Sequence, residues 1–285
     1  EGGSIVYTAS LTNPAQSAVT VTLSNGATIS IAAGASSGTV SVAAPSDDVY
    51  VDAGNVSATI SSASGGNFEN LAINPAAATT AVTDTINTTT VSLSGESTVS
   101  EGASSTYLLS LTSPAQGNVT VTLSYSGTAA NGTDFTGTTT VTIPNGASSA
   151  SFSIPTIDDA LVEGSENFTV AIASATGGNF ENLVVSGSNG SVTTAILDND
   201  TTALSVSSPT VAENAGFAQF TVSLSNLSTQ PTTVSLALAN GSAGSSDYGP
   251  TIQVSTDGGS TWTTASTAVI PANQSSILVR TPVIN

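Results

Sequence analysis

The stretch DDALVEGSENFTVAIASATGGNFENL, from Asp158 to Leu183, indicates the fold most directly, because apolar and polar or small residues alternate along its middle. Phe168, Val170 and Ile172 stand two residues apart. Successive side chains of a β-strand point to opposite faces, so this spacing predicts a strand with one buried face. The TGG that follows predicts a turn at the end of that strand.

An altered copy of this stretch, DDVYVDAGNVSATISSASGGNFENL, occupies Asp47–Leu71. Upstream of the two copies, EGGSIVYTASLTNPAQSAVTVTLS from Glu1 matches EGASSTYLLSLTSPAQGNVTVTLS from Glu101 at an offset of 100 residues. A weaker match, TVAENAGFAQFTVSLS, begins at Thr210. Self-similarity at a fixed period predicts an array of modules rather than one fold with one active site.

The period of two recurs at Val19–Leu23, Val119–Leu123 and Val141–Ile143, and turn signals such as SNG, PNG and DGG separate the runs. No stretch sustains an apolar period of 3.6 residues, so we expect essentially no helix. About seven strands in each module of ~100 residues are typical of an immunoglobulin-like sandwich. We therefore predict an all-β fold of tandem immunoglobulin-like β-sandwiches arranged as an extended rod.

The internal matches divide the chain into three repeats. Residues 1–87 are predicted to form an immunoglobulin-like repeat without its first strand, and residues 88–200 a complete repeat. Residues 201–285 are predicted to form a divergent repeat that is truncated at its C-terminal end. Because the chain begins inside a repeat, we expect it to be a stretch of a longer array. The joints DTINTTTVSL and LDNDTTALSV are short and do not have the composition of flexible tethers.

The chain has one basic residue, Arg280, and 19 acidic residues, which gives a net charge of -18. Nucleic-acid binding depends on Lys and Arg that neutralise phosphates, so this composition excludes it. An anionic membrane would repel the chain, and no run approaches the ~20 apolar residues that span a bilayer. We therefore expect no nucleic-acid partner and no membrane insertion.

Cys, His and Met are absent, which removes thiolate nucleophiles, imidazole bases and soft metal ligands. A pair of carboxylates could serve glycoside hydrolysis, but no cleft-lining aromatics and no basic group accompany the acids. Ser and Thr are abundant, yet no His or Lys is available to activate them. We predict that the chain is not an enzyme and that oxygen ligands carry its chemistry.

Acidic residues gather in the predicted loops of the complete repeat. Loops of a β-sandwich collect at its two ends, so acids that are distant in the sequence can meet at one pole. Ca²⁺ takes 6–8 oxygen ligands in irregular geometry, and without an ion the like charges would repel one another. The residues that we expect at this calcium site are Glu101, Asp134, Asp158, Asp159, Glu163, Glu166, Asp198 and Asp200.

The outer repeats carry acids at equivalent loop positions. The alternative interpretation is that acids simply occupy loops, since Asp favours turns, but the clustering favours a metal site. Only four acids lie outside these positions: Glu69, Glu96, Glu181 and Asp257. The candidate ligands in the outer repeats are Glu1, Asp47, Asp48, Asp52, Asp84, Glu213 and Asp247.

The EG that opens the complete repeat, the stretches GTAANGTDF and DDALVEGSENFTVAI, and the closing LDND resemble the Calx-beta domain. The resemblance covers the second repeat, most of the first and the start of the third. It implies that two or more calcium ions bind at one end of the sandwich, held in the complete repeat by the eight acids named for it above. The first repeat lacks the segment that contains Asp134 and has Gly54 in place of Glu166, so we expect fewer or weaker calcium sites there.

The segments SLTSPAQGNVTVTLS, GGNFENL and DTINTTTVSL are similar to the extender repeats of LapA-type large biofilm adhesins. That resemblance implies a protein of the Gram-negative cell surface, secreted by a type I, RTX-like route. It also implies a function in cell adhesion and biofilm formation, in which calcium-stabilised repeats hold a distal binding region away from the cell. The expected cofactor is Ca²⁺, and the expected partners are neighbouring repeats of the same chain.

Two other functions stay open from the sequence. The third repeat carries an insertion, Gln253–Ser266, with the only tryptophan, Trp262, which could be a stacking platform for sugars or the core of a long hairpin. A module that binds extracellular polysaccharide or surface proteins is therefore one alternative. The other is a reversible calcium sensor, which would bind calcium with micromolar rather than millimolar affinity.

The motif GGNFENL occurs twice, starting at Gly65 and at Gly177. It could be a ligand loop. We favour a tight turn or bulge that anchors Phe68 or Phe180 in the core.

Overall fold

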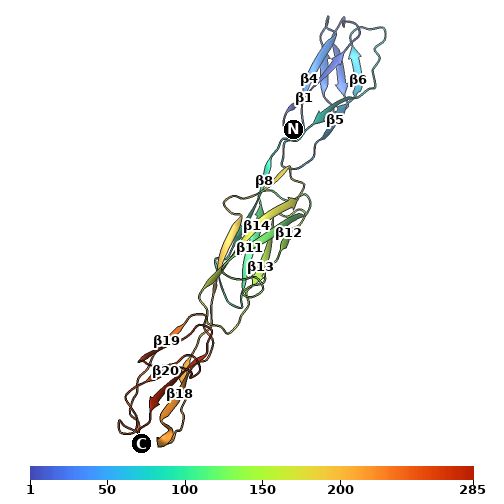
Figure 1. Cartoon of the computed structure of the whole chain (residues 1–285). Helices are drawn as coiled ribbons and strands as arrows, with labels where there is room; N and C mark the ends of the chain where they lie inside the picture. Colours follow the sequence, from blue (N-terminus) through green and yellow to red (C-terminus); the bar gives the residue numbers. More distant parts are fainter.

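The computed structural model describes residues 1–285, and its strands form three groups that follow one another along the chain. Figure 1 shows these groups end to end, with the C-terminus at the far end of the third. The only regular element that is not a strand is a single-turn 3-10 helix, Glu213–Ala215. No helix has the length and apolar character that crossing a membrane requires. The prediction of an all-β fold is confirmed.

The first sandwich contains seven strands in three small antiparallel sheets, ordered β1-β4, β3-β2-β6 and β5-β7. Its two-stranded β1-β4 sheet has no counterpart of the strand that opens the second sandwich. The strands are β1 (Ser4–Ser10), β2 (Val19–Leu23), β3 (Thr28–Ile31), β4 (Ser37–Ala43), β5 (Gly54–Ala58), β6 (Ile60–Gly65) and β7 (Ala78–Val82).

The second sandwich packs a four-stranded sheet, β13-β10-β8-β15, against a five-stranded sheet, β12-β11-β14-β16-β9. Two ladders in it are parallel, β15 with β8 and β16 with β9, and the others are antiparallel. The strands are β8 (Thr88–Gly95), β9 (Thr98–Ser100), β10 (Ser104–Leu111), β11 (Val119–Gly127), β12 (Thr140–Ile143), β13 (Ser149–Pro155), β14 (Glu166–Gly177), β15 (Asn182–Val185) and β16 (Ser191–Leu197).

The third sandwich contains a five-stranded sheet, β17-β18-β23-β20-β21, and a two-stranded sheet, β19-β22. β20 and β21 belong to the insertion that contains Trp262, and they extend the larger sheet beyond β23. The strands are β17 (Leu204–Val206), β18 (Phe217–Leu224), β19 (Thr232–Ser235), β20 (Gln253–Ser255), β21 (Thr263–Thr264), β22 (Thr267–Ile270) and β23 (Ser276–Pro282).

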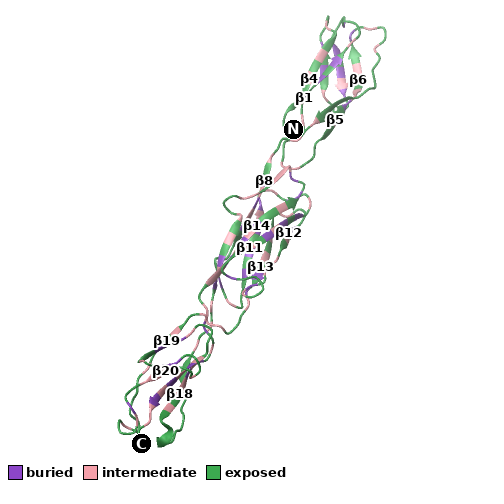
Figure 2. Cartoon of the chain, viewed as in Figure 1, coloured by how far each residue is buried: buried purple, intermediate pink, exposed green.

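Each group of strands has its own hydrophobic core, to which the strands contribute alternate residues (Figure 2). In β14, Phe168, Val170 and Ile172 are buried, and the residues between them, Thr169 and Ala171, are half-buried. Val19 and its counterpart Val119 are fully buried at the start of β2 and β11. Three separate cores mean that each sandwich excludes water from its own apolar side chains.

The GGNFENL motif of the second sandwich is a tight turn after β14. Gly177 and Gly178 have positive φ angles of 98° and 78°, and the ring of Phe180 is buried in the core. A Cβ on Gly178 would approach Phe180 to 2.4 Å, so only glycine fits there. The prediction of a turn that anchors an aromatic ring is confirmed.

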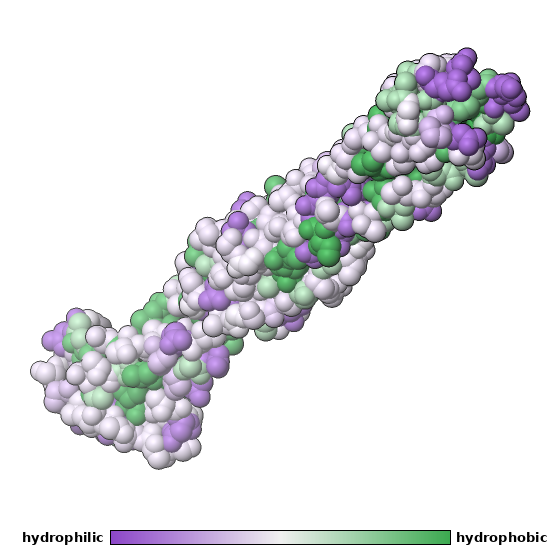
Figure 3. Space-filling view, turned by 90° about the horizontal axis from the view of Figure 1, so that it is seen from above, coloured by the Kyte–Doolittle hydropathy of each residue, from purple (hydrophilic) through white to green (hydrophobic).

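The outer surface is mostly weakly polar, and the apolar areas on the face shown in Figure 3 are small and separate. The wet faces of the strands carry Ser and Thr, as in β2, where Thr20 is exposed between two buried valines. These small hydroxyl side chains make the strand faces weakly polar. The charged residues of the molecule therefore stand mainly in its loops.

Candidate metal centre

The end of the second sandwich that faces the third gathers acids because two strands run parallel there. The parallel ladder of β9 and β16 ends with Ser100 opposite Leu197. Both strands therefore deliver the residues that follow them to the same edge, and Glu101 and Asp198 come first. The N–H of Glu101 donates to the carbonyl of Leu197 at 3.0 Å, which closes this edge.

The first group at this edge consists of Glu101, Asp198 and Asp200, whose ligand oxygens lie within 4.8 Å of one another. Asp198 Oδ1 accepts the N–H of Asp200 at 2.8 Å, which holds the LDND segment in a tight loop. Asp200 Oδ2 is shielded from solvent and has no hydrogen-bond partner. A shielded carboxylate oxygen without a donor, beside two further carboxylates, fits a cation that takes oxygen ligands.

The second group consists of Asp134, Glu163 and Glu166, again with ligand oxygens within 4.8 Å of one another. Asp134 directly precedes Phe135, which is 1% exposed and stacks on Phe168 with the ring centroids 4.4 Å apart. Burial of a phenylalanine side chain stabilises by roughly 1.5–3 kcal/mol, so the core anchors the loop that carries Asp134. Glu166 is the first residue of β14 and its position is fixed by the sheet.

Asp198 connects the two groups, because its Oδ2 accepts the N–H of Glu163 at 2.7 Å. Residues of both groups line one small cavity, whose remaining wall is formed by Ile157, Gly164 and Ile196. The two groups are therefore adjacent parts of one centre.

Asp158 and Asp159 lie beside the first group but belong to neither, and both are exposed. The N–H of Asp159 donates to Glu101 Oε1 at 3.3 Å. Asn199 Nδ2 donates to Asp158 Oδ1 at 3.2 Å and to the carbonyl of Glu101 at 3.1 Å. These two acids form the rim of the centre.

Four carboxyl groups of the centre, those of Glu101, Glu163, Glu166 and Asp200, have raised pKa values. Burial is the largest cause for Glu101, Glu163 and Glu166, and repulsion from neighbouring carboxylates adds to it. The pKa of Asp200 is raised by the same two effects. The one basic side chain, Arg280, lies in β23 of the third sandwich and does not offset this charge. The centre therefore favours a bound positive charge.

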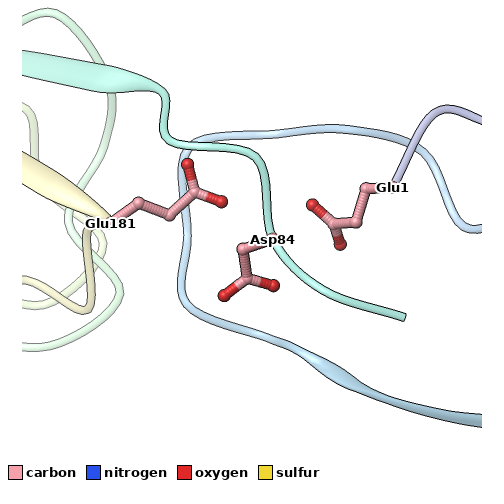
Figure 4. A group of neighbouring side chains, drawn as sticks. All are labelled: Glu1, Asp84 and Glu181. Atoms are coloured by element: carbon pink, nitrogen blue, oxygen red, sulfur yellow. The ribbon is translucent and has the colours of Figure 1, made fainter. Parts of the chain in front are cut away.

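The first sandwich has an acidic group at its junction with the second. Figure 4 shows Glu1, Asp84 and Glu181, whose ligand oxygens lie within 4.8 Å of one another. Each of the three has one oxygen that is shielded from solvent and lacks a hydrogen-bond partner. A hydrogen bond with Asp52, then burial, then the charges of Asp52 and Asp84 raise the pKa of Glu1 to about 7. The residues present fit a cation with oxygen ligands here too.

Asp47 and Asp48 turn toward the linker instead of joining this group. Asp47 Oδ1 accepts hydrogen bonds from the hydroxyl of Thr85 and from Asn87 Nδ2, and these bonds lower the pKa of Asp47. Asp48 Oδ1 accepts the N–H of Tyr50 at 2.7 Å. These two carboxylates shape the joint between the sandwiches.

In the third sandwich, Glu213 and Asp247 are exposed and line one open depression, but no third acid joins them. Asp247 Oδ2 accepts the N–H of Gly244 at 2.8 Å. This oxygen therefore already stabilises the turn that contains Asp247.

Sequence reasoning missed Glu181, which it placed outside the acidic loops. The residue lies in the GGNFENL turn of the second sandwich, yet its carboxylate meets acids of the first. The repetition of that motif was the available signal, but its other copy, with Glu69, leaves the glutamate exposed and in no group.

Trp262 is half-buried in the inserted hairpin and packs against Arg280. The guanidinium carbon Cζ of Arg280 lies 4.0 Å from the ring centroid of Trp262 and 4.0 Å from that of Phe217. Trp262 Nε1 donates to the carbonyl of Gly259 at 3.0 Å. The half-buried ring is thus part of the packing of the inserted hairpin.

Comparisons with known proteins place these sites in two domain families. The LapA domain model matches residues 1–85 and 87–199, and the Calx-beta domain model matches residues 198–256. Neither family is one of enzymes. No curated protein matches the sequence at a significant level.

Among solved structures, CBD12 from CALX1.2 is 21% identical, with a TM-score of 0.33 over 68% of this chain and 75% of that chain. The apo form of the Calx CBD1 domain is 25% identical, with a TM-score of 0.35 over 39% of this chain and 98% of that one. The calcium binding domain CBD12 of CALX1.1 is 22% identical, with a TM-score of 0.33 over 67% of this chain and 74% of that one. Because the LapA domain model covers well over half of the residues, the chain belongs to the LapA domain family.

Proposed function

We propose that this chain is a calcium-stabilised extender segment of a long adhesin, secreted to the surface of a Gram-negative bacterium and involved in cell adhesion and biofilm formation. The observation that carries the proposal is the meeting of carboxylates at the junction-facing ends of the first two sandwiches, with shielded oxygens that no donor satisfies. The LapA family supports the setting at the cell surface.

Calcium at these ends would neutralise the crowded carboxylates and so favour the folded loops over mobile ones. Asp198 would hold both halves of the main centre, since one of its oxygens already orients Glu163 and the other Asp200. The ring of Phe135 keeps Asp134 facing Glu163. Folding would therefore be completed where calcium is abundant, outside the cell.

The contacts at the joints support the function of an extender. At the first joint Tyr50 forms a β-bridge with Phe180, and at the second Val162 forms one with Ser228. Each bridge uses the loop that follows a pair of acids, so order in that loop and alignment of neighbouring sandwiches depend on each other. At a rise of ~3.3 Å per residue, a sandwich about ten strand residues long spans roughly 33 Å, so three sandwiches would span on the order of 100 Å.

The test is calcium removal from the full chain. A site saturated at 100-fold excess over its Kd adds about 2.7 kcal/mol, which corresponds to roughly 10–20 °C in Tm for a domain of this size. We expect a chelator to lower Tm by this amount and to shorten the particle or broaden its distance distribution in small-angle X-ray scattering. Unchanged Tm and scattering after chelation would show that calcium does not stabilise the segment.

A variant pair makes the test specific. In the double variant Asp134→Asn and Glu163→Gln, calcium should raise Tm of the second sandwich by less than in the wild type, because only the first acidic group stays intact. Glu96→Gln, which changes an exposed acid of the same sandwich outside both groups, should behave like the wild type. The calcium affinity separates an extender from a sensor: millimolar affinity fits a scaffold that is saturated outside the cell, and micromolar affinity fits a sensor.

A further inference from the structure

The first and second sandwiches differ at one strand edge. In the second, β10 lies between β13 and β8, but its counterpart in the first, β1, pairs with β4 alone. The N–H of Leu11 donates to Ser36 on the β4 side at 2.8 Å. Alternate residues of an antiparallel strand bond to alternate sides, so the main-chain groups of Val6, Thr8 and Ser10 face the open edge.

A buried hydroxyl lies on the same strand and has no partner. Tyr7 is 5% exposed, and its hydroxyl is shielded from solvent without a hydrogen bond. In the second sandwich, the hydroxyl of its counterpart Tyr107 is hydrogen-bonded to that of Thr194 on β16. Thr194 in turn donates to the carbonyl of Glu96, between β8 and β9, at 2.6 Å. A buried hydroxyl without a partner is destabilising, so the first sandwich lacks a contact that the second has.

The threonine that could serve Tyr7 is present but turned outward. Thr80 of β7 pairs with Val56 as Thr194 of β16 pairs with Phe168, so the two threonines correspond. Thr194 is fully buried, whereas Thr80 is exposed. β16 also pairs with β9, and β7 pairs with β5 alone. The strands β8 and β9 thus hold Thr194 in place, and nothing equivalent covers Thr80.

The frame that receives these strands is retained in the first sandwich. The N–H of Glu101, directly after β9, donates to the carbonyl of Leu197 at 3.0 Å. The amino group of Glu1 donates to the carbonyl of Thr83, at the corresponding place, also at 3.0 Å. The end of the parallel ladder therefore has the same geometry in both sandwiches.

β8 itself shows which segment fits such an edge. Val91 and Leu93 are buried in the core, and Ser92 between them is half-buried. Gly95 lies opposite Tyr107, and a Cβ on this glycine would approach the tyrosine ring to 2.2 Å. Because the first sandwich has a tyrosine at the same place, a matching strand needs two alternate apolar residues followed by a glycine.

We propose that the first sandwich is a strand acceptor, whose open edge of β1 and β7 takes an extended segment from another LapA-type repeat with the pattern of β8 and β9. Main-chain bonds to β1 supply affinity, and the alternate apolar residues and the glycine supply specificity. Covering this edge turns Thr80 inward to the hydroxyl of Tyr7. The inference goes beyond the calcium function and does not depend on it.

A labelled peptide with the sequence of residues 88–100, TTTVSLSGESTVS, tests the proposal against the full chain. Fluorescence anisotropy should show saturable binding. With the peptide at tenfold excess over its Kd, hydrogen exchange of the Val6, Thr8 and Ser10 amides should slow by about tenfold. The same peptide with Gly95→Val should bind about tenfold more weakly, because its side chain collides with Tyr7.

Two changes to the chain complete the test. Thr8→Pro removes an N–H that the ladder of β1 and β4 does not use, so circular dichroism should stay unchanged while peptide binding is lost. Placing TTTVSLSGESTVS directly before Glu1 repeats the order found in the second sandwich. This extended chain should have a higher Tm for the first sandwich and should no longer bind added peptide.

Absence of saturable binding would overturn the proposal, and so would equal affinity for the parent and Gly95→Val peptides. Peptide-induced protection in the third sandwich instead of β1 would place the acceptor elsewhere and refute it. Protection of β1 that grows with the concentration of the chain alone would identify a second copy as the occupant, which also refutes it. If Thr8→Pro unfolds the first sandwich, the two peptides and the extended chain still decide.

Discussion

Replacing Phe135 with alanine should destabilise the second sandwich and weaken its calcium centre at the same time. The ring is 1% exposed, stacks on Phe168 at 4.4 Å and lies 5.4 Å from the ring of Tyr125. It is also the residue next to Asp134, whose carbonyl accepts the N–H of Ile157 at 2.9 Å. Loss of the ring therefore empties part of the core and frees a loop that carries one of the acids.

The expected cost has two parts. Phenylalanine-to-alanine changes in cores cost about 3–5 kcal/mol, and the two aromatic neighbours of Phe135 favour the upper half of that range. In calcium a further loss appears, because a site at 100-fold excess over its Kd contributes about 2.7 kcal/mol that a displaced Asp134 no longer secures. The loss in calcium should thus exceed the loss in chelator by up to about 2.7 kcal/mol.

The assay must isolate the second sandwich, because the only tryptophan lies in the third and its fluorescence does not report on Phe135. Hydrogen exchange of peptides from β10, β11 and β14, followed in denaturant with and without calcium, gives the free energy of unfolding for this sandwich. Phe152→Ala is the control, since this ring stacks on Tyr107 and its strand, β13, carries no acidic residue; its cost should be equal in both conditions. A cost below about 1 kcal/mol for Phe135→Ala, or equal costs in calcium and chelator, would refute the reasoning.

Two further predictions concern single positions. Gly178→Ala should destabilise the second sandwich more than Gly146→Ala, because both have positive φ but only the first Cβ would collide, with Phe180 at 2.4 Å; equal Tm shifts for the two variants would contradict this. Hydrogen bonds from Ser255 and Thr261 hold the pKa of Asp257 well below its usual range. Its stabilisation is complete above the unfolded-state pKa of about 3.9 and is lost as pH falls through the lower folded-state pKa. Asp257→Asn should therefore flatten the acid side of the stability–pH curve of the third sandwich, and a variant curve parallel to the wild type would refute this.

The strands and the main acidic centre follow from local patterns in the sequence. The spacing of Phe168 and Val170 predicts a strand with one buried face. In the structure both side chains are buried in the core from strand β14. Glu101 and Asp198 could be expected together because loops of a sandwich share its ends. The parallel pairing of β9 and β16, which brings these two acids to one edge, is a long-range contact that no local pattern encodes.

The acids that sequence reasoning misplaced depend on competition and on docking. Asp47 is drawn away from Glu1 by hydrogen bonds with Thr85 and Asn87, and which donor a carboxylate accepts is decided by three-dimensional proximity. Glu181 meets Asp84 only because two sandwiches touch. The sequence pattern of a single domain does not predict how it is placed against its neighbour.

The bridges at both joints have a consequence for how such arrays change over generations. Their hydrogen bonds join main-chain groups, which every residue except proline possesses, so side-chain complementarity matters little for the next sandwich to attach. Duplication or deletion of a whole unit by recombination between similar gene segments would then leave a working connection at the new boundary. The length of the array can thus change by entire modules.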